Sequence, residues 1–199
     1  MIDNSQQIIP LLKFEEGTFY CLQVLQRRKD NPGMTWQTKQ RYFKFIRTEE
    51  EFKVFYTEAI ELSNLYNART YISLIPRSFE KLSLEALVEL ATRMKNKDFS
   101  NNFRIFEKLA LLPECAIRDG KLWMIDYDEP NVEGFLRLLK KYEITVDSTL
   151  PTPKGYHIVI KPFNFRRLGS SVDSDYNYDI EGFKFGIKFD CNVLLYYGK

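Results

Sequence analysis

The sequence predicts an α+β protein, a mixed α/β arrangement whose strands are mostly antiparallel. Segments rich in aromatic and β-branched residues, which are typical of strands, end at clear turn signals. Between them lie segments whose apolar residues repeat with the helical period. In the second half, the order strand, helix, strand, strand favours an open sheet with helices on one face.

The first half of the chain carries the signals of strands and helices in alternation. Lys29–Gly33 (K-D-N-P-G) predicts a turn between the first two strands, which we expect to pair antiparallel. Thr48, followed by Glu51, fits a capping box and marks the start of a helix. The expected strands are 18–28, 39–46 and 69–75, and the expected helices are 48–64, 83–94 and 101–111.

The pattern changes near Pro113, so we place an internal boundary at 111–113. This divides the chain into a smaller N-terminal α/β unit, 1–112, and a second unit, 113–199, packed together as one compact domain. The expected strands of the second unit are about 114–118, 121–127, 144–150, 156–160, 183–189 and 192–197, with a helix from 131 or 132 to 142, a helical turn at 162–168 and a polar loop at 169–177.

Composition limits the function only loosely. Hydrophobic residues make up 44% of the 199 residues, and the net charge is +2. This charge neither demonstrates nor excludes a nucleic-acid partner, because basic residues can cluster locally. Arg27-Arg28-Lys29 and Arg166-Arg167 are such clusters, although solvated turns or strand ends explain them equally well.

The cysteines and the single histidine exclude some classes of site. Cys21, Cys115 and Cys191 are far apart and fit neither a disulfide framework nor a zinc pattern, so we expect buried thiols in a reducing compartment. With His157 as the only histidine, a two-histidine zinc site is excluded. No signal peptide and no membrane span are expected, which predicts a cytoplasmic protein without a membrane partner.

The strand expected at 121–127 leads into a pair of carboxylates. Residues two apart on a strand point to the same side, so Asp126 and Asp128 should lie side by side, with Tyr127 packing on the other face. Two carboxylates this close repel unless they share a cation. Hard oxygen ligands suit Mg²⁺ or Mn²⁺. The alternative is an ordinary solvated turn.

A second polar group lies in the next hairpin, at Thr152–His157 (T-P-K-G-Y-H). Thr152 offers a hydroxyl, Lys154 a cation, and Gly155 a position where backbone amides can approach a ligand closely. Phosphate oxygens favour this set of donors. His157 follows at the start of a strand, where it is either a site residue or an ordinary core histidine.

A third carboxylate would complete an acidic metal site. We favour Asp190, because its apolar flanks indicate a fixed position between two strands, although a hairpin-turn role is the alternative. Asp173, Asp175 and Asp179 compete for the same role from the polar loop.

The order of these motifs resembles the catalytic core of the archaeo-eukaryotic primase superfamily, which includes primase-polymerases. The three motifs of that family match Ile125–Asp128, Gly155–His157 and Phe189-Asp190, and the similarity covers roughly 114–199. The resemblance implies an RRM-like sheet that carries the site and a metal-dependent nucleotidyltransferase that acts in DNA replication.

The resemblance also assigns roles to residues. Asp126, Asp128 and Asp190 would hold two divalent ions, Mg²⁺ or Mn²⁺, for in-line displacement on a triphosphate. The incoming nucleoside triphosphate would be held by His157, Lys154, Gly155 and Thr152. Arg69, Arg77, Arg166 and Arg167 are candidates for contacts with phosphates, single-stranded DNA or a primer-template.

Other functions fit the same residues. The chain could be a catalytically weak or inactive DNA-binding protein of replication or of a mobile element, on the same fold. It could also be another nucleotide-dependent transferase that uses Asp-x-Asp, or a nuclease.

Overall fold

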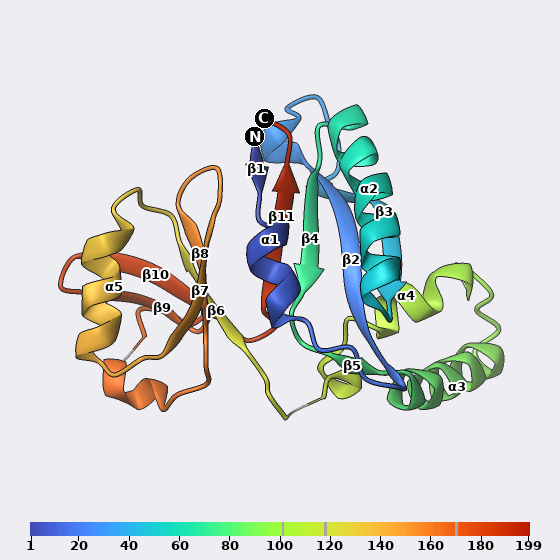
Figure 1. Ribbon diagram of the computed structural model, residues 1–199. Helices are drawn as coiled ribbons and strands as arrows, with labels where there is room; N and C mark the ends of the chain where they lie inside the picture. Colours follow the sequence, from blue (N-terminus) through green and yellow to red (C-terminus); the bar gives the residue numbers. More distant parts are fainter. Residues whose placement is uncertain (101, 118, 170) are drawn as a thin grey trace.

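The computed structural model describes residues 1–100, 102–117, 119–169 and 171–199 (Figure 1). It confirms the predicted α+β class with antiparallel sheets. One sheet has six strands and the other has five. Figure 1 shows the two sheets side by side, with the chain termini close together on the six-stranded one.

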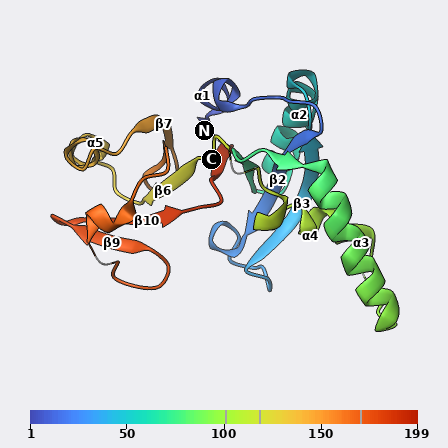
Figure 2. The same ribbon diagram turned by 90° about the horizontal axis from the view of Figure 1, so that it is seen from below.

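The six-stranded sheet has the order β1-β11-β4-β2-β3, and β5 pairs with the start of β2. Residues of α1 and α2, such as Ile8 and Phe52, cover one face, where they pack against Leu22. Residues of α3 and α4 pack against Phe19 on the other face, and α3 extends away from both sheets (Figure 2). The bounds are β1 (Ile2–Asp3), α1 (Ser5–Ile8), β2 (Thr18–Arg27), β3 (Thr38–Ile46), α2 (Glu49–Leu65), β4 (Arg69–Ser73), β5 (Arg77–Ser78), α3 (Phe79–Lys95), α4 (Ile105–Leu109) and β11 (Asn192–Tyr197).

The five-stranded sheet has the order β7-β8-β6-β10-β9. Helix α5 lies on the side away from the first sheet (Figures 1 and 2). There Tyr127 is buried and stacks on Phe135 with 4.2 Å between ring centroids, so the packing role predicted for Tyr127 is confirmed. The bounds are β6 (Trp123–Tyr127), α5 (Val132–Lys141), β7 (Val146–Pro151), β8 (Tyr156–Ile160), β9 (Asn177–Ile180) and β10 (Phe183–Lys188).

The two sheets share one apolar core. Met124, Leu150 and Val159 of the second sheet belong to the same buried cluster as Ile72 and Val193 of the first. The second sheet is therefore not an independent hydrophobic unit, because one of its faces is completed by the first sheet.

The strands do not divide at the predicted boundary. Strand β11, expected in the second unit of 113–199, lies between β1 and β4 in the first sheet. The second sheet thus runs only from Trp123 to Lys188. An apolar strand pattern indicates a strand but does not identify its partner, which depends on packing between segments far apart in the chain.

Several local predictions also differ from the structure. The strand expected at 114–118 is wrong, since Pro113–Cys115 forms a 3-10 turn, and residue 118 lies outside the described residues. The helix expected at 101–111 begins on a residue outside the description and is reduced to a 3-10 turn, Asn102–Arg104, followed by α4. Strand β9 was not expected, because polar residues surround it.

The prediction for the cysteines holds. Cys21, Cys115 and Cys191 are buried free thiols, as their spacing indicated. Among the described residues, no helix is both long and apolar enough to cross a membrane.

Candidate functional site

A row of side chains crosses the second sheet on the face opposite α5. Asp126 of β6 lies directly across from His157 of β8 on one side and from Gly186 of β10 on the other. Gly186 in turn pairs with Asn177 of β9. Because side chains directly opposite on neighbouring antiparallel strands share a face, the sheet brings Asp126 and His157 together.

A pocket of about 460 Å³ opens beside this row. Asp126 and Asp128 both line it, which agrees with the spacing of two along the strand. Gly186 leaves room here, because a Cβ atom at that position would lie 2.6 Å from Asn177 Oδ1. The remaining polar residues that line the pocket are Asn177, Asp179, Lys184 and Lys188.

The charge of Asp126 is poorly compensated. Burial raises the pKa of its carboxyl, and the negative charge of Asp128 raises it further. The positive charges of Lys188, Lys29 and Arg27 act in the opposite direction and do not cancel these effects. The pair therefore favours a shared proton or a shared cation.

His157 connects the two sheets. Its Nδ1 accepts a hydrogen bond of 3.0 Å from the backbone N–H of Leu194 in β11. The neutral ring must then carry its proton on Nε2, which lies 3.7 Å from Asp126 Oδ1. That distance is too long for a hydrogen bond, so the Nε2 proton is available to another acceptor.

The imidazole of His157 is neutral at neutral pH. Burial lowers the pKa of the ring to about 4, and the nearby cations Arg69, Arg27 and Lys29 lower it in the same direction. The approach of His157 to Asp126 is accordingly not an ion pair. The ring presents an uncharged N–H donor beside Asp126, although His157 itself does not line the pocket.

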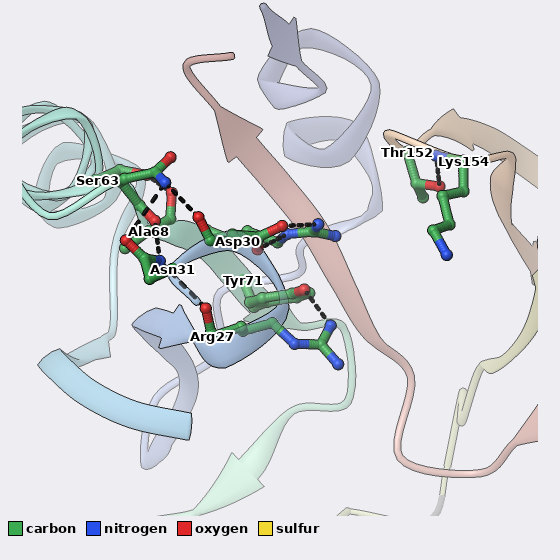
Figure 3. Close-up of polar contacts among 10 residues, drawn as sticks. Arg27, Asp30, Asn31, Ser63, Ala68, Tyr71, Thr152 and Lys154 are labelled. Carbon is green, nitrogen blue, oxygen red and sulfur yellow. Dashed lines mark hydrogen bonds and ion pairs between the residues drawn. The ribbon is translucent and has the colours of Figure 1, made fainter. Parts of the chain in front are cut away.

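The turn before His157 has a more structural role than the sequence indicated. A Cβ atom at Gly155 would lie 2.0 Å from the carbonyl oxygen of Tyr127, so only glycine fits against the end of β6. The Thr152 hydroxyl oxygen accepts a 3.1 Å hydrogen bond from the Gly155 N–H. Gly155 thus positions the Asp-x-Asp segment, and Lys154 is the exposed cation of the turn (Figure 3).

Asp190 does not join the carboxylate pair, so the predicted three-carboxylate site is wrong. Among the described residues, no group of three or more acidic, histidine or cysteine side chains is placed to hold a metal ion. Strand β10 runs antiparallel to β6, and Asp190 follows Gly186 by four residues. It therefore lies toward the start of β6, whereas Asp128 follows its end.

The competing aspartates of the polar loop have different positions. Asp173 accepts hydrogen bonds from the backbone of Asp175 and Asn177, which folds the loop. Asp175 is exposed, and Asp179 lines the pocket. Asp179 pairs with Lys184 across β9 and β10, so a cation stands between it and the carboxylate pair.

None of the four predicted arginines lines the pocket. Arg69 is buried and makes two hydrogen bonds, of 2.7 and 2.6 Å, to the carboxylate of Asp30. Arg77 is buried and donates to the Leu112 carbonyl at 2.8 Å. Arg167 pairs with Glu143 at the end of α5, and its neighbour Arg166 is exposed. Only Arg69 influences the site, through its charge on His157.

Four further cations that act on or line the site were not selected from the sequence. Lys184 and Lys188 flank Gly186 with the strand period, a signal that depends on knowing the register of β10. Arg27 and Lys29 belong to the basic cluster at the start of the first turn, where a solvated role was an equal alternative.

Comparison with protein-family models, curated proteins and solved structures finds no match. The resemblance to the archaeo-eukaryotic primases therefore rests on the sequence motifs alone.

Proposed function

We propose that this protein is a metal-dependent nucleotidyltransferase of the primase or primase-polymerase type. The observation that supports it best is the pairing of Asp126 with His157 on adjacent strands, together with a pocket that both Asp126 and Asp128 line. An Asp-x-Asp strand beside a histidine strand is the arrangement that the motif resemblance implies. The proposal includes an RRM-like type for the second sheet and a role in cytoplasmic DNA replication.

The residues present fit one divalent cation. Asp126 and Asp128 offer hard oxygen ligands, and the raised pKa of Asp126 indicates a pair in need of positive charge. Mg²⁺ commonly binds through one or two carboxylates together with substrate phosphates. When bound, Mg²⁺ or Mn²⁺ would neutralise charge that develops on a triphosphate. A second protein-held ion lacks its third carboxylate, since Asp190 lies elsewhere.

The chain's own groups would orient the nucleotide. Asp126 and Asp128 would hold the cation, and the Nε2–H of His157 would donate to a phosphate oxygen. A neutral donor keeps this contact independent of pH around neutrality, because the pKa of His157 is about 4. Lys154, exposed on the turn beside the pair, adds positive charge near the triphosphate. Single-stranded DNA or a primer-template is the proposed polymeric substrate.

A second candidate follows from the position of Asp190. A nucleic-acid-binding protein on the same fold, with weak or no catalysis, would not need a third carboxylate. Such a protein of replication or of a mobile element would keep nucleotide or DNA binding. Another Asp-x-Asp transferase or a nuclease shares the carboxylates but has no use for a template.

Nucleotide incorporation on a single-stranded DNA template tests the proposal. We expect labelled nucleotide to be incorporated with Mg²⁺ or Mn²⁺. Asp126→Asn and Asp128→Asn should each reduce the rate at least roughly 100-fold, because loss of even an outer partner of a metal site costs 10–100-fold. Asp190→Asn is the matched control and should remain active. If the wild type binds the template but incorporates nothing with either metal, the second candidate replaces the first.

A further inference from the structure

Two positive side chains at the end of β2, Arg27 and Lys29, act electrostatically on the carboxylate pair and the histidine of the second sheet. Arg27 ends β2, and Lys29 lies in the turn that follows. Both lower the pKa of Asp126, and both lower that of His157, so their charges are within electrostatic reach of the site. Asp128 acts in return on the pKa of Lys29.

A path of direct contacts places Arg27 relative to His157. The His157 ring binds the backbone of Leu194, and Leu194 pairs with Tyr71 across β11 and β4. The Tyr71 hydroxyl accepts a hydrogen bond of 3.1 Å from Arg27 Nη1. Figure 3 shows this contact and the Thr152–Lys154 turn on opposite sides of β11.

The turn that carries Lys29 is held by buried polar contacts. Asp30 binds Arg69 through both carboxylate oxygens, and these two side chains are only 9% and 8% exposed. Asn31 Nδ2 donates to the carbonyl of Arg27 at 3.1 Å and to that of Asn67 at 2.9 Å. These bonds tie the turn to the end of α2 and the start of β4, as Figure 3 shows, so the backbone that carries Lys29 is held in place.

The same contacts decide which charges are free. The carboxylate of Asp30 is used by Arg69. Within the described part of the chain, neither Arg27 nor Lys29 forms an ion pair, and the hydrogen-bond partner of Arg27 is a neutral phenol. Burial and the charges of Arg27 and Arg69 lower the pKa of Lys29. Among the described residues, Arg27 and Lys29 therefore carry positive charge without an anionic partner. Asp126, beside Asp128, carries negative charge that the nearby cations do not cancel.

We propose that Arg27 and Lys29 form the anion-binding half of the nucleotide site and hold the polyphosphate of the metal-bound nucleotide. This inference rests on the proposed function. One ligand, a divalent cation with a polyphosphate, supplies both missing charges: the cation to Asp126 and Asp128, the phosphates to Arg27 and Lys29. Arginine and lysine are the side chains that phosphate oxygens favour.

Binding of inorganic tripolyphosphate by the full chain in the presence of Mn²⁺ tests the inference. Arg27→Met and Lys29→Met remove the charge and keep most of the side-chain volume. Each should weaken tripolyphosphate binding roughly tenfold, the usual size of one lost charge-assisted contact. Arg28→Met, on the exposed neighbour, is the matched control and should change binding less than about twofold. Thermal unfolding of all variants checks that the fold is intact.

Binding of Mn²⁺ alone, followed by its electron paramagnetic resonance signal, gives an effect of opposite sign. Lys29→Met and Arg27→Met should leave Mn²⁺ affinity unchanged or raise it a few-fold, because each removes a cation that repels the metal. Asp126→Asn should abolish the Mn²⁺ binding. A general loss of structure would instead weaken both ligands together.

The outcomes separate the inference from the proposed function. If Mn²⁺ binds through Asp126 and Asp128 while Arg27→Met and Lys29→Met bind tripolyphosphate as the wild type does, the inference is overturned and the function survives. If these variants lose affinity only for a single-stranded oligodeoxythymidine, the cations hold the nucleic-acid backbone and the inference is again overturned. If the wild type binds tripolyphosphate through these cations but no Mn²⁺, the anion site stands and the proposed function fails.

Discussion

The two faces of the second sheet contrast sharply, although their residues alternate along the same strands. On one face Ile125 and Tyr127 pack under α5, where Tyr127 stacks on Phe135. On the other face Met124 packs in the core shared with the first sheet, and beyond it Asp126 lies between His157 and Gly186 beside an open pocket. One strand thus serves both the core and the site. Packing fixes the strand, and the strand places the polar groups without a loop to hold them.

The largest expected effect comes from removing a buried side chain on the apolar face of the second sheet, which packs under α5. Phe135→Ala removes the ring that stacks on Tyr127 and should destabilise the protein by about 3–5 kcal/mol, the usual cost of a buried Phe→Ala change. Denaturant unfolding measures this free energy. Phe99→Ala is the control, because Phe99 is 67% exposed. Equal costs for the two variants would contradict the assigned packing.

The buried His157 should make the stability of the protein depend on pH. The fold lowers the pKa of His157 from its ordinary value of 6.5 to about 4. Between these values the unfolded chain binds the proton more readily, so this contribution to stability is complete above pH 6.5 and is lost as pH falls toward 4. The loss is up to about 3 kcal/mol, from the shift in pKa.

His157→Asn isolates this effect. The Asn oxygen can replace Nδ1 as the acceptor for the Leu194 N–H, and the amide does not titrate. Its unfolding free energy, measured from pH 7 to pH 4, should therefore fall less than that of the wild type. Parallel curves for the two proteins would show that His157 is not held neutral by burial.

The smallest expected effect concerns Asp126. Because its pKa is raised, its charged form is disfavoured in the fold, and this penalty is present at neutral pH and disappears below the ordinary value of 3.8. Asp126→Asn should therefore raise the stability of the metal-free protein at pH 7 by less than about 1 kcal/mol, since the side chain is 42% exposed. Thermal unfolding measures it, with the exposed Asp190→Asn as control. A clear loss of stability would mean that Asp126 is a structural residue.

The contrast between the faces is also what the sequence predicts best. The spacing of two on a strand separates Asp126 and Asp128 from Tyr127, and the structure agrees. The position of Asp190 was predicted wrongly, because it depends on the register of β10 against β6. Register is set by packing between distant segments, and no local pattern reveals it.

The positions of Arg27 and Lys29 also depend on packing between distant segments, which the sequence does not reveal. The link from Arg27 to His157 runs through β11, which returns to the first sheet and whose Leu194 backbone binds His157. Gly155 was selected from the sequence as a position where a ligand could approach the backbone. In the structure a glycine is required there for a different reason. Its neighbour proves to be the backbone of Tyr127, which a turn motif cannot indicate.

The hydrogen bond from Leu194 to His157 has a consequence for communication within the molecule. A group that accepts a hydrogen bond from Nε2–H makes Nδ1 a stronger acceptor, because hydrogen bonds through one ring polarise each other. Occupancy of the pocket would then tighten the junction between the sheets. The Leu194 amide would report it, as slower hydrogen exchange when ligand is present. The hydrogen bond between the two sheets through His157 would thus be stronger when a ligand is bound than when the pocket is empty.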